Sequence, residues 1–209
     1  KPPKSCPRNK PMREAKGRIG PNTILQFVPV LEAATGATET ARLLAQAGIT
    51  ALPDPSAGLI EEGPAARLHQ LVRQALPGDA ARLAIAAGQA TGDYILAHRI
   101  PKPAQAVLRH LPARLSVPIL SKAIAKHAWT FCGSGEFRLA ASWPVRFEIL
   151  DNPVVRGEVS EEPLCHWHAA VFARLFDRLC GQGWQAVETT CCAQGARVCR
   201  FEMRRSRQS

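Results

Sequence analysis

Apolar residues recur three or four positions apart through the first two thirds of the chain, which is the spacing of one helix face. The pattern predicts three helices before the chain midpoint. They cover residues 22–31, 38–47 and 65–76, with Gly48 closing the second and Pro77-Gly78 closing the third. Pro29 lies inside the first helix and predicts a kink or a break, because proline cannot donate the hydrogen bond of a helix interior.

A longer helix is expected from Asp79, whose carboxylate is placed to cap it, to His98. Gly88 and Gly92 lie four positions apart on this helix. Two small residues at that spacing permit the close approach of another helix or of a flat ligand, and we interpret them as a helix contact.

A helical run interrupted by prolines follows over 104–129 and ends at Gly133-Ser134-Gly135. Beyond this point apolar residues alternate, which predicts two strands joined near Trp143-Pro144. Pro163 suits the first turn of a helix that ends near Leu179. The last two apolar stretches, 184–191 and 196–204, read as a hairpin around Gln194-Gly195.

This order of elements describes an α+β fold, in which an N-terminal helical segment packs on an antiparallel sheet with a C-terminal helix and a β-hairpin. We divide the chain into a disordered basic tail, a helical segment and a strand-strand-helix-hairpin part. Their ranges are 1–21, 22–132 and 133–204.

Composition narrows the functional classes. The 209 residues carry a formal net charge of +10, and 46% of them are hydrophobic. Much of the positive charge lies at the two ends, and the chain has a single Tyr and neither a helix-turn-helix nor an RNA-binding aromatic motif, so we expect no nucleic-acid partner. Seven cysteines indicate a reducing compartment. No secretory signal or apolar run of membrane length is present, which predicts a cytosolic protein.

Three cysteines and one glutamate near the end of the chain form the strongest chemical signal. Cys165, Glu188, Cys191 and Cys199 follow the spacing Cys-x22-Glu-x2-Cys-x7-Cys. Thiolates are soft ligands and a carboxylate is a common fourth ligand, so this set predicts a tetrahedral Zn²⁺ site. Cys165 lies near the start of a helix, where the partial positive charge favours a thiolate.

The hairpin determines which residues can meet. A turn centred on Gly195 places Cys191 opposite Cys199, but Glu188 and Cys191 are three apart and point to opposite faces of a regular strand. The site therefore requires a bulge or an early exit from the strand. Cys192 competes with Cys191 for the ligand position, and the cysteines can also be ordinary buried thiols.

At this point the C-terminal part, from about 80 to 204, resembles the vinyl-4-reductase domain family. The resemblance rests on Gly133-Ser134-Gly135, the strand pair 137–150 and the segment 165–199. It implies a bound zinc held by the Cys, Glu, Cys, Cys set named above. The basic start and alanine-rich helical half are similar to members called 4-vinyl reductases, which implies a role in bacteriochlorophyll biosynthesis, at the conversion of divinyl to monovinyl pigments.

Reducing a vinyl group needs a redox cofactor, and the sequence has no G-x-G-x-x-G after a strand, no P-loop and no ferredoxin cysteine spacing. We therefore expect a protein that binds or delivers the Mg-tetrapyrrole, divinyl protochlorophyllide or chlorophyllide, to a separate vinyl reductase or another pigment-synthesis enzyme. Two alternatives stay open. The chain is the reductase itself, using NADPH, or it is a ligand-sensing regulatory or assembly module.

A tetrapyrrole needs an apolar cleft, an axial ligand for magnesium and a partner for its propionate. Aromatic residues at the junction between helices and strands can line such a cleft or form plain core; they are Trp129, Phe131, Phe137, Trp143 and Phe147. Axial candidates are His98 and His127, with His110, His166 and His168 also available. Arg99, Lys102 or Arg109 can meet the propionate. We also expect a homodimer through the N-terminal helices, and membrane attachment, if any, at the periphery of the photosynthetic membrane.

Overall fold

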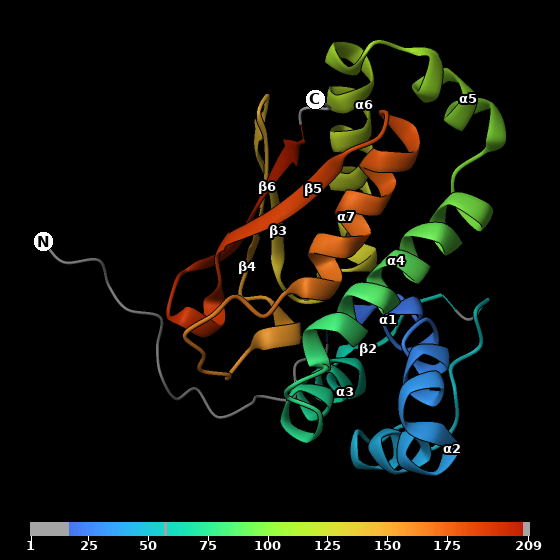
Figure 1. Cartoon of the computed structure of the whole chain (residues 1–209), viewed down its shortest axis with the longest axis vertical. Coiled ribbons are helices and arrows are strands. Elements are labelled where there is room, and N and C mark those ends of the chain that lie inside the picture. The colour runs from blue at the N-terminus through green and yellow to red at the C-terminus, as the bar shows by residue number, and fades with distance from the viewer. Residues whose placement is uncertain (1–16, 57, 207–209) are drawn as a thin grey trace, which may run out of the picture.

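The computed structural model describes residues 17–56 and 58–206. A four-stranded antiparallel sheet forms one side of the molecule, in the strand order β3-β4-β6-β5. Its strands are β3 Glu136–Ser142, β4 Val145–Leu150, β5 Trp184–Thr190 and β6 Val198–Arg205. Helix α7 (His166–Leu179) packs against one sheet face, and α4 (Ala80–His98) packs on the outer side of α7 (Figure 1). The predicted α+β fold is confirmed.

The other helices extend the helical layer toward both ends of α4 and α7 (Figure 1). Near the start of α4 lie α1 (Asn22–Leu25), α2 (Val28–Gln46) and α3 (Glu62–Ala75). At the other end lie α5 (Lys102–His110) and α6 (Ala113–Lys126), and α6 also packs on β3 and β4. Short 3-10 turns cover Ala128–Thr130, Pro153–Val155 and Cys192–Gln194.

Several predicted boundaries need correction. The chain breaks at Gln26–Phe27, so Pro29 lies in the first turn of α2, where its missing N–H is not required. Helix α2 continues with a kink at Gly36 (φ 80°) into the segment predicted as a separate helix over 38–47. Asp79 precedes α4 but makes no side-chain cap, because its carboxylate pairs with Arg82 at 2.8 Å.

The predicted disordered tail over 1–21 is also wrong in its last part. Arg18–Ile19 form β1, which pairs with β2 (Ile60–Glu61), and Ile19 is buried. Residues 1–16 lie outside the described part of the chain. Helix α7 starts at His166 with Cys165 at its N-cap, so Pro163 precedes the helix.

Alternation along the strands separates a buried sheet face from a charged one. Val145, Phe147 and Ile149 of β4 are buried toward α7, together with Phe201 and Met203 of β6. The opposite face carries ion pairs between neighbouring strands, such as Arg200 with Glu148 at 2.8 Å. The apolar face therefore anchors α7, whose first residues form the site described below.

Among the described residues, no helix combines the length and apolar character that crossing a bilayer would need.

Candidate metal centre and adjoining hollow

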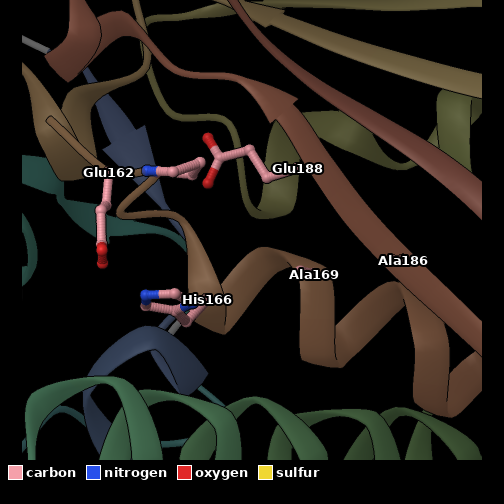
Figure 2. Close-up of a pocket in the computed structure, with 6 residues that line it drawn as sticks. Glu162, His166, Ala169, Ala186 and Glu188 are labelled. Atoms are coloured by element: carbon pink, nitrogen blue, oxygen red, sulfur yellow. The ribbon is translucent and has the colours of Figure 1, made fainter.

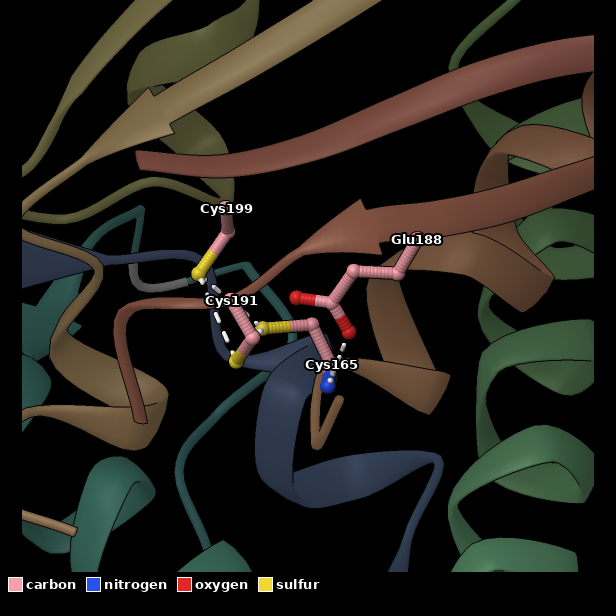
Figure 3. A group of neighbouring side chains, drawn as sticks. All are labelled: Cys165, Glu188, Cys191 and Cys199. Atoms are coloured by element: carbon pink, nitrogen blue, oxygen red, sulfur yellow. Dashed lines mark hydrogen bonds between the residues drawn. The ribbon is translucent and has the colours of Figure 1, made fainter. Parts of the chain in front are cut away.

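Four side chains from three elements meet at the start of α7 (Figure 3). Cys165 occupies the N-cap of α7, Glu188 is in β5, Cys191 follows the end of β5, and Cys199 is in β6. One ligand atom from each lies within 4.8 Å of all the others. The structure thus brings together the whole predicted set, and this cluster could hold a metal ion.

The bulge that the spacing required is present in β5. Glu188 pairs with Phe201 whereas Thr190 pairs with Arg200, so one extra residue is inserted between them. The insertion turns Cys191 to the same side as Glu188 and leaves it beside Cys199. Cys192 is not part of the cluster of ligand atoms, and its side chain is only partly buried.

The sulfur atoms have the spacing of thiolates around one ion. Cys165 Sγ lies 3.4 Å from Cys199 Sγ and 4.0 Å from Cys191 Sγ, and the last two are 3.9 Å apart. Zn–S bonds of about 2.3 Å at tetrahedral angles separate sulfurs by roughly 3.8 Å. All three cysteines are free and buried, as a closed metal site requires.

Glu188 has a buried oxygen that the protein does not satisfy. Its Oε2 accepts a 2.7 Å hydrogen bond from the backbone N–H of Cys165, whereas Oε1 is buried without a hydrogen-bond partner. Burial and the neighbouring Cys191 raise the pKa of this carboxyl to about 8. A buried carboxylate of this kind is expected to be paired with a cation, and a metal ion among the thiolates would supply one.

The thiols share protons in the same enclosed space. Hydrogen bonds from Cys165 and Cys199 lower the pKa of Cys191, and burial raises the pKa of Cys165. The expectation that the helix start favours a Cys165 thiolate is therefore opposed by its burial. A metal ion would replace the shared protons, because thiols bind metals as thiolates.

Two further groups donate hydrogen bonds to the sulfurs. Asn152, which is fully buried after β4, donates from Nδ2 to Cys165 Sγ at 3.3 Å. The backbone N–H of Cys192 donates to Cys199 Sγ, also at 3.3 Å. Such donors orient and stabilise metal-bound thiolates. The sequence analysis missed Asn152, because a single asparagine after a strand reads as an ordinary turn residue.

A hollow of about 400 Å³ opens beside the metal centre (Figure 2). Glu188 contributes to both, so the hollow adjoins the cluster directly. The first turns of α7 and the middle of β5 supply most of its lining, which consists of Glu162, Pro163, His166, Ala169, Ala186 and Glu188. It combines a small apolar wall with two carboxyl groups and one half-buried imidazole.

The aromatic residues proposed to line a pigment cleft separate into two groups. Phe131, Phe137 and Phe147 pack together in the core, with ring centroids 5.3 Å apart for the pairs Phe131–Phe137 and Phe137–Phe147. Trp129 and Trp143 are exposed, at 54% and 58%. None of the five lines the hollow beside the metal centre, and their contact with a pigment stays a prediction.

The candidate histidines are also spread over the fold. His98, His110 and His127 are exposed, and His98 stacks on Tyr94. His168 is buried, with Nε2 3.1 Å from the carbonyl of Phe131 and Nδ1 without a partner. His166 alone of the five lines the hollow.

The basic candidates do not converge on that hollow. Arg99, Lys102 and Arg109 are exposed near the α4–α5 junction and along α5. Arg109 donates to the backbone carbonyl of Arg178 at 3.1 Å and to Gln105 at 3.0 Å.

Comparison with known proteins places this architecture in a family. The chain is 55% identical over 186 residues to a protein of Cereibacter sphaeroides named bacteriochlorophyll synthase 23 kDa chain, covering 89% of this chain and 90% of the relative. The chain belongs to this family. A Rhodobacter capsulatus protein of the same name is 44% identical, covering 88% of this chain and 85% of the relative.

The model of the vinyl-4-reductase domain matches residues 145–205, the segment that contains all four cluster residues. This match is shorter than the span of about 80–204 expected for the domain.

Solved structures extend the comparison to the whole fold. An H-NOX protein from S. oneidensis in its Fe(II)NO state superposes with a TM-score of 0.57 at 14% identity, covering 90% of this chain and 99% of that protein. An unliganded Fe(II) H-NOX protein from K. algicida gives the same TM-score at 10% identity, covering 91% and 98%. These similarities show a shared fold, in which the helical half and the sheet belong to one arrangement.

Proposed function

We propose that this protein binds or delivers a magnesium tetrapyrrole in bacteriochlorophyll synthesis, at the step that converts a divinyl pigment to its monovinyl form. The observation that carries the proposal is the 55% identity, over nine tenths of both chains, to a protein named as a chain of bacteriochlorophyll synthase. A chain of a pigment-synthesis enzyme is expected to meet the pigment or the other chains that process it.

The metal centre supports a binding role over a catalytic one. Three cysteines and one glutamate complete a tetrahedron, so a bound ion has no free position for a substrate. We propose Zn²⁺ as the ion and a structural role for it. The ion would join the start of α7 to the β5–β6 hairpin and so hold one wall of the adjoining hollow in place.

We propose the hollow as the place where one edge of the pigment is held. Its volume of about 400 Å³ is at the lower end of small-molecule sites, so most of a tetrapyrrole ring would extend beyond it. Ala169 and Ala186 provide a low apolar wall, and the His166 imidazole could act as an axial ligand of magnesium. Vinyl reduction would then be carried out by a separate vinyl reductase or another pigment-synthesis enzyme that receives the pigment.

The decisive experiment mixes purified, zinc-loaded protein with divinyl protochlorophyllide, with and without NADPH, and follows absorbance and product by chromatography. We expect stoichiometric binding and no monovinyl product in either case. Steady formation of monovinyl pigment would instead support the reductase alternative. Absence of binding would refute the carrier proposal.

A substitution tests the assigned site. His166→Gln should weaken pigment binding while the zinc content is unchanged, whereas His98→Gln, at an exposed position away from the hollow, should bind as the native protein does. Equal affinities for all three proteins would remove His166 from the proposal.

We further propose that the protein works in the cytoplasm at the periphery of the photosynthetic membrane, and that it forms a homodimer through its N-terminal helices. Analytical ultracentrifugation of the full chain would reveal the dimer, and a monomer at all concentrations would contradict it.

A further inference from the structure

The segment between Tyr94 and Gly135 has a one-sided charge. It contains no Asp or Glu, and its six basic residues are all exposed; they are Arg99, Lys102, Arg109, Arg114, Lys122 and Lys126. Elsewhere in the fold, exposed arginines such as Arg42, Arg82 and Arg138 pair with a nearby carboxylate. Positive charge is therefore left without local compensation over α5 and α6.

Helix α6 sorts its residues onto two faces. Val117, Leu120 and Ile124 are buried on the side that packs against the sheet. The outer side carries Leu115, Ile119, Lys122 and Lys126, whose spacings of four, three and four positions align them in one stripe. Both charged and apolar members of this stripe are exposed, with Leu115 at 55% and Ile119 at 50%.

Trp129 follows the stripe in the 3-10 turn Ala128–Thr130 and is 54% exposed. We refer to Leu115, Ile119, Lys122, Lys126 and Trp129 as the α6 stripe. Exposed leucine and isoleucine cost free energy in water, and a tryptophan with an apolar ring and a polar N–H suits a boundary between water and lipid.

We propose that the α6 stripe is the surface by which this protein docks on an anionic lipid bilayer. Helices that lie in the plane of a bilayer combine lysines with exposed leucine, isoleucine or tryptophan on the side that meets the lipid. The lysines attract anionic headgroups, and the apolar side chains then enter the headgroup boundary. This inference specifies the surface for the peripheral location proposed above, and it does not depend on pigment binding.

An acidic protein could satisfy the lysines, but the exposed apolar residues favour lipid. They lie on the outer side of a helix, and the hollow beside the metal centre and a second hollow between α2 and α4 are both lined by other residues. A fluid bilayer adapts to a convex stripe, whereas a protein partner would need a matching concave surface.

The test uses the full chain without pigment in a flotation assay with two kinds of vesicle. One kind is phosphatidylcholine alone, and the other contains about one third phosphatidylglycerol, which makes its surface strongly anionic. The native protein should float with the anionic vesicles, bind the neutral ones far less, and dissociate as the salt concentration rises.

Two double variants assign the binding to the stripe. Lys122→Glu with Lys126→Glu should weaken binding to anionic vesicles at least about tenfold, because each lysine near such a surface contributes appreciably. Arg42→Glu with Arg82→Glu produces the same change of net charge on α2 and α4 and should weaken it much less.

Leu115→Ser with Ile119→Ser leaves the charge unchanged and should also reduce binding if apolar insertion takes part. The proposal is overturned if the native protein does not bind anionic vesicles, or if either stripe variant binds as well as the native protein. In the latter case other cations, including the basic residues 1–16, would account for the binding. Circular dichroism of each variant establishes that it is folded.

Discussion

Cys191 and Cys192 are adjacent in the sequence but have different surroundings. Cys191 is completely buried, with its sulfur 4.0 Å or less from those of Cys165 and Cys199. Cys192 is half-buried and contributes its backbone N–H, which donates to Cys199 Sγ. Only a substitution that removes a sulfur from the cluster should therefore remove a metal ligand.

We predict that Cys191→Ser lowers zinc affinity at least about a hundredfold, whereas Cys192→Ser changes it by less than about tenfold. Competition with a chromophoric chelator measures both affinities. Adding excess chelator to the native protein should also lower its melting temperature, because metal binding stabilises the folded state. The reverse order of the two variants would show that Cys192 is the ligand.

The four cluster residues could be predicted from the sequence because their chemistry and spacing are local properties of a hairpin and a helix start. Even the bulge followed from the three-residue separation of Glu188 and Cys191. Asn152 and His166 could not be assigned in the same way. Each gains its role only when the loop after β4 or the start of α7 is placed beside the hairpin, and sequence spacing does not encode that placement.

At the scale of elements, α4 and α7 form the tightest helix contact, and two glycines permit it. A Cβ added at Gly88 would lie 2.5 Å from the backbone oxygen of Trp167 and 2.7 Å from Ala170 Cβ. One added at Gly92 would meet the side chain of Arg174, which can move aside. Helix packing is therefore the role of this glycine pair, as the sequence analysis interpreted it.

We predict that Gly88→Ala destabilises the fold by about 1–3 kcal/mol, because the backbone of α7 must shift to admit the methyl group. Gly92→Ala should cost less. Gly78→Ala is the matched control, since a Cβ there has no atom within 4 Å. Urea unfolding of the three variants measures the free energies, and an unchanged stability for Gly88→Ala would mean that α4 and α7 are not held at this distance.

Helix and strand types followed from the apolar period, but their ends depended on contacts that the period does not contain. β1 exists because Arg18–Ile19 pair with Ile60–Glu61, more than forty positions later in the sequence. The residues predicted as a tail thus become ordered through a partner that no local pattern reveals. In the same way Asp79 was predicted as a cap from its position, whereas Arg82 one turn later captures its carboxylate.

At the scale of the molecule, one buried glutamate joins the helical half to the sheet. Glu62 at the start of α3 is 2% exposed; it accepts hydrogen bonds from the backbone and hydroxyl of Ser134, both at 2.6 Å, and pairs with Arg156 at 3.1 Å. A Cβ at Gly133 would lie 2.2 Å from its carboxylate, which explains the glycine there. The glycine-rich break thus forms a cradle for a long-range contact, although the sequence showed only that the helical run ended.

A second buried group links overall stability to pH. His69 of α3 is enclosed between Phe27 and Trp167, and its Nε2–H donates to the carbonyl of Thr23 at 3.2 Å. Burial lowers its pKa from 6.5 to about 3, so the folded protein keeps this imidazole neutral. The unfolded chain takes up a proton below pH 6.5 that the folded chain does not, and the free energy of unfolding therefore falls as the pH falls from 6.5 toward 3.

We predict that His69 alone lowers the stability of the native protein by about 2 kcal/mol between pH 7 and pH 5, which is the cost of about 1.5 pH units of withheld protonation. His69→Gln can keep the hydrogen bond to Thr23 without titrating. Its packing defect should reduce stability at pH 7, but its loss between pH 7 and pH 5 should be smaller than that of the native protein by about this amount. Urea unfolding of both proteins at the two pH values gives the difference, in which the contributions of all other titrating groups cancel. Equal losses in the two proteins would mean that His69 becomes protonated within the fold, and that the contact between α3 and α7 opens more readily than its burial indicates.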